Sequence, residues 1–151
     1  MSKIEKVLVT GKTHTTVSGA GGTSRGHDGS VNIELSSPGN GANPAHVFSA
    51  IQPHPTAEQL FAGAWSACYI AAVGLVAKEM KVALPPDLSV DIEVDLGMTG
   101  QAYFLQARFN VRIPGVAHDV ATAIAHAADE ICPYSKATRG NIDVALNVFT
   151  S

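Results

Sequence analysis

The two cysteines, Cys68 and Cys132, have the most distinctive chemistry in this chain. Cys68 lies in the longest apolar run of the sequence, and Cys132 follows it by 64 residues. A cysteine attacks as its thiolate, so a reactive cysteine needs a nearby group that lowers its pKa, such as an arginine, a lysine, a histidine or a helix N-terminus. The alternative is a pair of inert thiols, because free cysteine is among the residue types most often buried.

A cation that activates Cys68 has to come from elsewhere in the chain. Cys68 lies about 12 residues into a predicted helix, and the effect of a helix dipole fades within the first turn. The candidates are Arg25, in a glycine-rich segment, and Arg139, which follows Cys132. A guanidinium stays charged when it is desolvated, which suits an apolar pocket.

The nearest acid in the run, Glu58, precedes Cys68 by ten residues. On a straight helix it would stand about 15 Å from Cys68, at a rise of ~1.5 Å per residue. Glu58 can therefore join a site with Cys68 only if the helix breaks, if a loop bridges the two, or if another subunit supplies the glutamate. Alternatively, Glu58 is a first-turn acid that interacts favourably with the helix dipole.

Other kinds of site find less support in the sequence. His46 and His54 flank a proline-rich loop, and His118 and His126 share the outer face of a predicted helix. Because no His–Cys or His–Glu cluster has ligand spacing, we expect no metal site, and no Ser–His–Asp arrangement can be assigned by spacing. Residues 11–13 resemble the end of a phosphate-binding loop, but the earlier glycine that such a loop requires is missing.

The composition predicts a single domain, residues 1–151, that associates with other copies. Hydrophobic residues make up 46% of the chain and charged residues 15%, so apolar surface should remain exposed on a monomer. The net charge of −3 without a basic run argues against nucleic acid as a partner. The N-terminus lacks an apolar segment of signal-peptide length, so we expect a cytoplasmic protein. Residues 60–77 carry no charge, but they are rich in alanine and glycine, which favours a buried helix over a membrane span.

The hydrophobic pattern predicts an α+β fold in which helices pack on an antiparallel sheet. A capping box at Thr56 and Gln59 begins a helix that continues to about residue 81. Apolar residues surround this helix, so we expect a long central helix that is buried on nearly all sides. The other predicted elements are strands at 4–10, 13–17, 30–35, 88–96, 102–113 and 142–148, a helix at 116–131, turns at 28–29 and 97–100, and a long loop at 36–55.

Two motifs resemble those of a known family. Residues 58–69 read Glu-Gln-Leu-Phe-Ala-Gly-Ala-Trp-Ser-Ala-Cys-Tyr, which is similar to the first motif of the organic hydroperoxide resistance (Ohr) branch of the OsmC/Ohr family. Residues 132–144 read Cys-Pro-Tyr-Ser-Lys-Ala-Thr-Arg-Gly-Asn-Ile-Asp-Val, which resembles the second motif of that branch. The spacing between the cysteines, and that between Glu58 and Cys68, also fit the family.

The resemblance implies a thiol-dependent peroxidase that works as an intertwined homodimer. Cys68 would be the peroxidatic cysteine, which becomes a sulfenic acid, and Cys132 would be the resolving cysteine, which condenses with it to a disulfide. An arginine paired with Glu58 would polarise the peroxidatic thiol. The family binds no cofactor for this chemistry and relies on an external dithiol, typically lipoyl groups on proteins, to reduce the disulfide.

The sequence departs from the family pattern in two places. The family arginine usually follows a Gly-Gly pair directly, whereas Thr23 follows Gly21-Gly22 here and Arg25 comes two residues later. The segment at 38–58 is also longer than the pattern, which would reshape the mouth of the pocket.

The expected substrates are organic hydroperoxides, either alkyl or lipid-derived. Phe61, Trp65 and Tyr69 lie near the thiol in sequence, and an apolar pocket built from them would bind an alkyl tail, which hydrogen peroxide lacks. The alternatives are an OsmC-like peroxidase with a broader peroxide range and a thiol redox sensor with little turnover.

Overall fold

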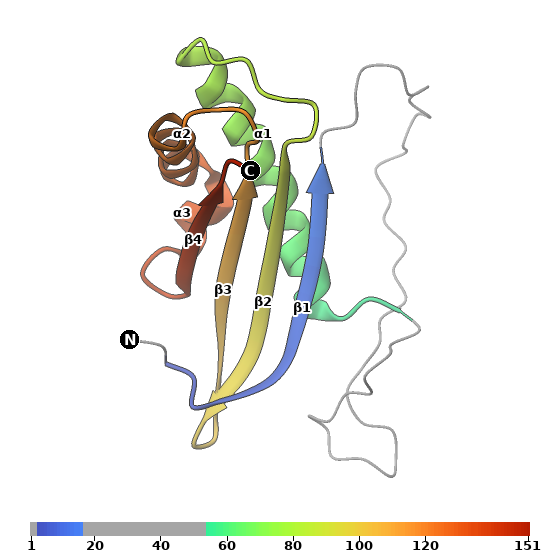
Figure 1. Cartoon of the computed structure of the whole chain (residues 1–151). Coiled ribbons are helices and arrows are strands. Elements are labelled where there is room, and N and C mark those ends of the chain that lie inside the picture. Colours follow the sequence, from blue (N-terminus) through green and yellow to red (C-terminus); the bar gives the residue numbers. More distant parts are fainter. Residues whose placement is uncertain (1–2, 17–53) are drawn as a thin grey trace, which may run out of the picture.

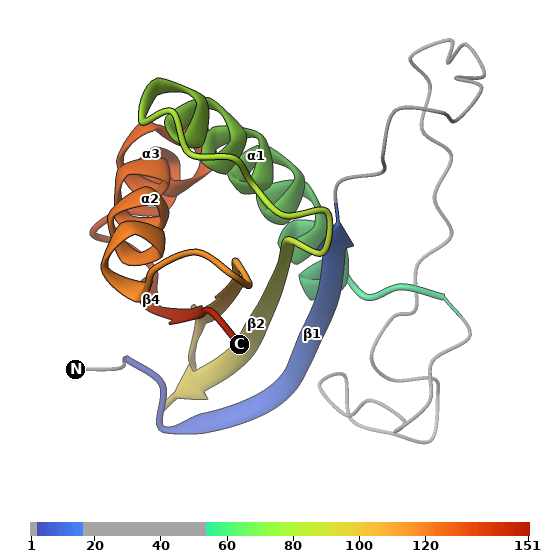
Figure 2. The same cartoon turned by 45° about the horizontal axis from the view of Figure 1, so that its top comes forward.

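The computed structural model describes residues 3–16 and 54–151, which form a four-stranded sheet with three helices gathered on one side of it (Figures 1 and 2). The longest helix, α1, contacts β1, β2 and the other two helices, while α2 also contacts β4. The elements in chain order are β1 (Lys6–Thr16), α1 (Ala57–Glu79), β2 (Ser89–Thr99), β3 (Ala102–Arg112), α2 (His118–Ile131), α3 (Pro133–Thr138) and β4 (Asp143–Phe149).

Helix α1 begins with the capping box that the sequence predicts. The hydroxyl of Thr56 accepts a hydrogen bond from the backbone N–H of Gln59 at 3.2 Å. The side-chain oxygen of Gln59 accepts one from the backbone N–H of Thr56 at 3.0 Å. These two bonds satisfy donors that every helix N-terminus leaves unpaired, and they set where the helix starts.

The other end of α1 closes with a Schellman motif. The N–H of Lys81 bonds to the carbonyl of Lys78 at 3.1 Å, and the N–H of Val82 bonds to the carbonyl of Ala77 at 2.9 Å. Lys81 adopts a left-handed conformation with φ of 56°, a conformation usually taken by glycine at this position. Val82 then packs against the core, which completes the hydrophobic contact typical of the motif.

The sequence predicts that α1 is buried on nearly all sides, in a core or at an interface, and within the single chain only part of the helix surface is buried. One face packs into the core through residues that include Trp65, Tyr69 and Val73. The opposite face carries a stripe of exposed apolar residues at helical spacing: Phe61, Ala64, Ala67, Ala71 and Leu75. We call these five residues the α1 stripe. The helix is long and apolar enough to cross a membrane, but half of its most apolar stretch is buried against the rest of the protein.

The first three strands are antiparallel and lie in the order β1-β2-β3. The strands predicted at 4–10 and 13–17 form one continuous strand, β1, with an irregularity in its pairing between Val7 and Val9. The turn between β2 and β3 lies at Gly100 and Gln101 rather than at 97–100, because β2 continues to Thr99 and Gly100 supplies the positive φ of 57° that the turn needs.

The last strand, β4, pairs with β3 in parallel, so the sheet is mixed and the predicted all-antiparallel arrangement is wrong. Helices α2 and α3 form the crossover that a parallel pair requires. The short helix α3 was not predicted. Pro133 does end α2, but it also occupies the first turn of α3, where its missing N–H costs nothing.

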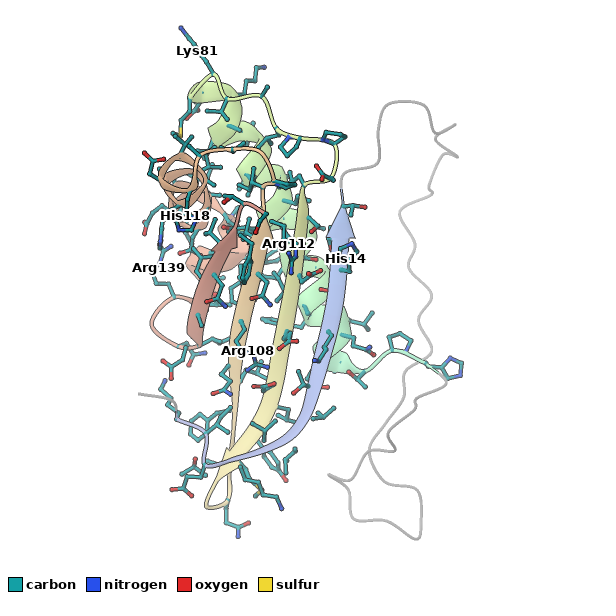
Figure 3. All side chains as sticks on the ribbon, in the orientation of Figure 1. His14, Lys81, Arg108, Arg112, His118 and Arg139 are labelled. Carbon is teal, nitrogen blue, oxygen red and sulfur yellow. The ribbon has the colours of Figure 1, made fainter. Side chains whose placement is uncertain are left out.

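The sheet face away from the helices carries a network of charged residues (Figure 3). Its centre is Asp95, which is 2% exposed. Arg108 donates to one Asp95 oxygen at 2.9 Å and Gln106 donates to the other at 2.7 Å, and the Thr10 hydroxyl also bonds to Asp95. Arg108 reaches Glu93 as well, at 2.9 Å. Every oxygen of the buried carboxylate therefore has a donor.

Several predictions lie outside the described residues. They are the glycine-rich segment with Arg25, the turn at 28–29, the strand at 30–35, His46, and all but the end of the loop at 36–55.

Candidate active site

The sulfur atoms of Cys68 and Cys132 lie 3.3 Å apart. The two residues come from different elements, Cys68 from the middle of α1 and Cys132 from the junction of α2 and α3. Both are free thiols; Cys68 is partly exposed, whereas Cys132 is fully buried. Because the bond length of a disulfide is about 2.05 Å, only a small approach of the two sulfurs separates this arrangement from a disulfide.

The chain holds Cys132 at this junction through backbone hydrogen bonds on both sides. Its N–H bonds to the carbonyl of Ala128 at 2.9 Å, as the last bond of α2, and its carbonyl accepts from the N–H of Lys136 at 3.0 Å, as the first bond of α3. With φ of −61° and ψ of 121°, Cys132 is the extended residue at which the chain turns from one helix into the next. The thiol position is thus set by two helices at once.

The environment of Cys68 within the described chain raises the pKa of its thiol. Burial is the largest cause, and the hydrogen bond and charge of the neighbouring Cys132 act in the same direction. A hydrogen bond from the backbone N–H of Tyr134 opposes them by favouring the thiolate. Among residues 3–16 and 54–151, no cation contributes to this balance, so a cation that activates Cys68 has to come from outside these residues.

Glu58 is buried in the first turn of α1, with 8% of its surface exposed. One of its carboxylate oxygens, Oε2, has no hydrogen-bond partner in the described part of the chain. Leaving a buried carboxylate oxygen without a donor is costly. Helix α1 is unbroken between Glu58 and Cys68, so a helix break does not bring the two residues together. The remaining possibilities are a bridging loop and a second subunit.

Gly11 of β1 sets the position of this first turn. A Cβ atom at Gly11 would stand 2.5 Å from the backbone of Gln59 and Glu58, and 2.7 Å from the Cβ of Glu58. Only a glycine therefore lets β1 pack this closely on the turn that carries the buried acid. The sequence did not mark Gly11 as a residue that matters for the site. It drew attention only because residues 11–13 resemble the end of a phosphate-binding loop, an interpretation that the missing earlier glycine rules out.

Arg139 is not the cation for Cys68. Its guanidinium donates to Asp129 at 2.8 Å and to Glu130 at 3.3 Å, both on α2, and to the backbone carbonyl of Asp129 at 2.9 Å. It lies at the molecular surface (Figure 3). The other candidate, Arg25, falls outside the described residues.

The three aromatic residues of the expected pocket occupy different depths. Phe61 is 36% exposed, while Trp65 and Tyr69 are fully buried. The Tyr69 hydroxyl donates to the carbonyl of Ala125 at 2.7 Å. Trp65 and Tyr69 therefore form the packed layer beneath the thiol, and Phe61 is the member of the three that can meet a ligand at the surface.

Trp65 also makes a contact that sequence reasoning missed. Its indole N–H donates to the hydroxyl of Ser135 on α3 at 3.1 Å. A small cavity of about 210 Å³ lies beside this bond, lined by Trp65, Asp129, Ser135, Thr138, Arg139, Gly140, Ile142 and Val144. The signal that could have revealed the contact is spacing, because Trp65 precedes Cys68 by three residues and Ser135 follows Cys132 by three.

Within residues 3–16 and 54–151, no group of three or more histidine, cysteine or acidic side chains could hold a metal ion. His118 and His126 are exposed on α2, and His54 is exposed before α1. A second cavity, of about 370 Å³, lies by the far end of the sheet; its lining is Leu96, Tyr103, Phe104, Leu105, Asn141 and Ile142.

Comparison with known proteins places the chain in a family. Residues 49–147 match the family described as OsmC-like protein. An organic hydroperoxide resistance protein of Xanthomonas axonopodis pv. citri is 33% identical over 155 residues, which cover 98% of this chain and 99% of that protein.

Solved structures agree with the sequence comparison. The crystal structure of an organic hydroperoxide resistance protein from Elizabethkingia anophelis matches with a TM-score of 0.69 and 30% identity, covering 98% of this chain and all of that chain. The structure of OhrB of Bacillus subtilis matches with a TM-score of 0.59 and 35% identity over 64% of this chain and 72% of that chain. The chain therefore belongs to the OsmC/Ohr family, within its organic hydroperoxide resistance branch.

Proposed function

We propose that this protein is a cysteine-based peroxidase that reduces organic hydroperoxides. The observation that carries the proposal is the 3.3 Å contact between the partly exposed sulfur of Cys68 and the buried sulfur of Cys132. The exposed thiol is the one that a peroxide can reach, and the buried thiol is placed to react with it afterwards. The family membership and the named relatives support organic hydroperoxide resistance and a redox role.

The reaction proceeds in three balanced steps. The Cys68 thiolate attacks one oxygen of the hydroperoxide; the O–O bond breaks, Cys68 becomes a sulfenic acid, and the departing alkoxide takes up a proton to give the alcohol. The Cys132 thiol then attacks the Cys68 sulfur, so that an S–S bond forms, the S–O bond breaks and water leaves. An external dithiol, for which lipoyl groups are the expected source, reduces the disulfide by exchange and is itself oxidised.

Activation of Cys68 is assigned to a cation that pairs with Glu58. The buried carboxylate has an oxygen without a donor in the described chain, and the thiol has a raised pKa with no cation beside it there. A guanidinium can donate to a carboxylate and favour a thiolate at once. Because Glu58 and Cys68 of one chain lie about 15 Å apart along an unbroken helix, this role requires that Glu58 of one copy approach Cys68 of a second copy. We assign this role to Arg25.

The α1 stripe is assigned to a second copy of the chain and to the alkyl part of the substrate. Leu75 is 59% exposed and Phe61 is 36% exposed in the single chain. Near the thiol, Tyr134 is 49% exposed and Ile131 is 41% exposed. A homodimer that covers the stripe would leave an apolar entrance beside Cys68, which suits an alkyl or lipid hydroperoxide better than hydrogen peroxide.

The test measures peroxide consumption with dihydrolipoamide as reductant, using cumene hydroperoxide and hydrogen peroxide in parallel. The wild-type protein should consume the organic peroxide much faster than hydrogen peroxide. Cys68→Ser should abolish consumption, whereas Cys132→Ser should still react once with peroxide and then accumulate an unresolved sulfenic acid. Unchanged turnover in Cys68→Ser would sink the proposal, and equal rates with the two peroxides would indicate a broader-range OsmC-like peroxidase.

One observation favours a second candidate, a thiol redox sensor with little turnover. The described surroundings of Cys68 raise the pKa of its thiol, and a thiol that stays protonated reacts slowly with peroxide. The two functions are separated by the thiolate absorbance of Cys68 as a function of pH. A titration near the ordinary range of a thiol, together with slow single-turnover oxidation, would identify a sensor; a titration well below that range would identify the peroxidase.

A further inference from the structure

We propose that the hydrogen bond between Trp65 and Ser135 is a positioning clamp that holds the two sulfurs in register for disulfide formation. The inference deepens the proposed function and rests on it. Trp65 and Ser135 touch no reacting atom; they act through the elements that carry the thiols.

The geometry consists of two parallel rungs between α1 and the segment that begins at Cys132. One rung is the sulfur contact of Cys68 and Cys132 at 3.3 Å, and the other is the bond from the Trp65 indole to the Ser135 hydroxyl at 3.1 Å. On both segments the two positions are three residues apart. Trp65 and Cys68 lie about one turn apart on one face of α1, whereas Cys132 is the extended N-cap residue of α3 and Ser135 lies in the first turn of that helix. A shift of α3 along or around α1 would therefore break both rungs together.

Each end of the clamp is fixed by its own surroundings. The Trp65 ring packs edge-to-face on Phe109 of β3, with ring centroids 4.8 Å apart, and on Phe61 at 5.6 Å. Trp65 is 1% exposed and Ser135 is 2% exposed. Because both side chains are buried, truncating one of them leaves the polar group of the other without its partner, which is costly.

The segment that carries Cys132 needs such a restraint because it is short. Helix α3 has six residues, and a helix of that length is not stable by itself in water. Its local bonds, such as that from the Thr138 hydroxyl to the carbonyl of Tyr134 at 3.0 Å, shape the helix but do not fix it to α1. The bond from Trp65 to Ser135 does fix α3 to α1, because it crosses between the two helices.

The chemical consequence concerns the second step of the reaction. Once Cys68 is a sulfenic acid, either Cys132 closes the disulfide with loss of water, or a second peroxide molecule oxidises Cys68 further to a sulfinic acid, which is not readily reversed. The rate of closure depends on how well the attacking sulfur is held in place. The clamp therefore favours closure over irreversible oxidation, and it has little influence on the first attack on peroxide.

An equilibrium experiment tests the clamp without peroxide. The wild-type protein, Ser135→Ala and Trp65→Phe are equilibrated with reduced and oxidised dithiothreitol, and the fraction of the Cys68–Cys132 disulfide is measured by alkylation and mass spectrometry. Each variant should lower the equilibrium constant for disulfide formation, because the dithiol state can then relax out of register. The decrease should be at most about threefold to tenfold, the range for one hydrogen bond, since the bond is already present while both cysteines are free thiols. The double variant should have an equilibrium constant no lower than that of the more impaired single variant, because the two residues share one bond. Thr138→Val, which removes a buried hydroxyl from the same helix, should match the wild type.

A kinetic experiment separates the clamp from a general loss of stability. Rapid-quench mass spectrometry follows sulfenic acid formation and disulfide closure after mixing with cumene hydroperoxide. Ser135→Ala and Trp65→Phe should form the sulfenic acid at the wild-type rate, close the disulfide several-fold more slowly, and accumulate sulfinic acid at lower peroxide concentrations.

Two outcomes would overturn the clamp. One is that both variants keep the wild-type equilibrium constant and closure rate. The other is that only Trp65→Phe differs, which would show that the ring volume matters and the hydrogen bond does not. A failure of the proposed function looks different: the wild-type protein itself would form no sulfenic acid with peroxide, while the dithiothreitol equilibrium would still report on the clamp.

Discussion

Gly11, which has no side chain, determines where the carboxylate of Glu58 lies. The strand β1 meets the first turn of α1 at a distance that leaves no room for a Cβ on Gly11. The acid on that turn is buried with one oxygen unpaired in the described chain. The position of the carboxylate, and hence of any cation that it recruits, depends on this close approach.

Gly11→Ala should therefore destabilise the protein, by about 1–3 kcal/mol as expected for an overpacked site, and it should slow peroxide reduction by displacing Glu58. Gly74→Ala is the matched control, because a Cβ at Gly74 meets nothing within 4 Å. In mid-helix this control should raise stability by up to about 1 kcal/mol. Urea denaturation and the peroxidase assay measure both effects; equal stability of the two variants would contradict the argument.

Asp95 supports a prediction about pH. Burial alone would raise the pKa of Asp95, but hydrogen bonds from Arg108, Gln106 and Thr10 outweigh it and hold the pKa at about 2. Because the folded pKa is lower than the unfolded value, the carboxylate contributes stability above about pH 4, and this contribution is lost as the pH falls towards 2.

Asp95→Asn should accordingly lower the free energy of unfolding at pH 7 by about 2.5 kcal/mol, because the pKa of Asp95 is lowered from its ordinary value to about 2 and each unit corresponds to about 1.4 kcal/mol. The difference from the wild type should shrink steadily between pH 4 and pH 2. Denaturation curves across that range provide the measurement, with Asp87→Asn as an exposed control. A difference that stays constant with pH would show that Asp95 acts through packing instead of charge.

Among the elements, α1 has the most clearly encoded start. The capping box at Thr56 is read directly from residue types at fixed spacing. The alternation in β2 and β3 likewise predicts which side chains face the helices, and Val90, Ile92, Phe109 and Val111 are fully buried as expected. Such local patterns predict an element and its buried face because the same residues both form the element and pack it.

Other features depend on partners far away in sequence and could not be predicted in this way. The alternation of apolar and polar residues in β4 does not indicate whether the strand runs parallel or antiparallel to its neighbour. Its parallel pairing with β3 follows only from the crossover through α2 and α3. Helix α3 was missed because Pro133 marks both the end of one helix and the start of another. The sulfur contact was implied by a resemblance, whereas the partner of Trp65 and the commitment of Arg139 to α2 needed the structure.

The C-terminal end of α1 supports a prediction at Lys81. A left-handed conformation costs a residue with a side chain about 1–2 kcal/mol relative to glycine, and Lys81 has φ of 56°. Lys81→Gly should therefore raise stability by about 1 kcal/mol, observable as a higher melting temperature. Lys81→Ala keeps the strain and should leave the melting temperature nearly unchanged. A rise in both variants would instead point to the lost charge.

In the molecule as a whole, the largest unexplained feature is the α1 stripe. An apolar face along the longest helix is unusual for a monomer, and its exposed members, from Phe61 to Leu75, carry no charge. Covering this stripe with the same stripe of a second copy would give the helix the all-round burial that its composition predicts. It would also bring a second Glu58 towards the shared interior, and one oxygen of that carboxylate has no hydrogen-bond partner among the described residues.

Leu75→Glu should convert the proposed dimer to a monomer, because it places a charge at the large, exposed apolar side chain that ends the α1 stripe. Analytical ultracentrifugation of the wild type and the variant measures the change. Ala123→Glu, at an exposed position on α2, introduces the same side chain elsewhere and should remain dimeric. A wild-type protein that sediments as a monomer would contradict the homodimer.

The pairing of β1 with β2 has a consequence for how the chain folds. Lys6 pairs with Met98 and Thr16 pairs with Ser89, so β1 can find its neighbour only after the long intervening segment, which includes α1, has been made. Closing so long a loop is slow, whereas the β2–β3 hairpin and α1 can form early. Burial of Glu58 depends on β1, so it should be among the late events. A newly made chain would thus hold its thiols on nearly complete helices while Glu58, at the start of α1, still faces water, and its redox chemistry would begin only when the N-terminal strand has docked.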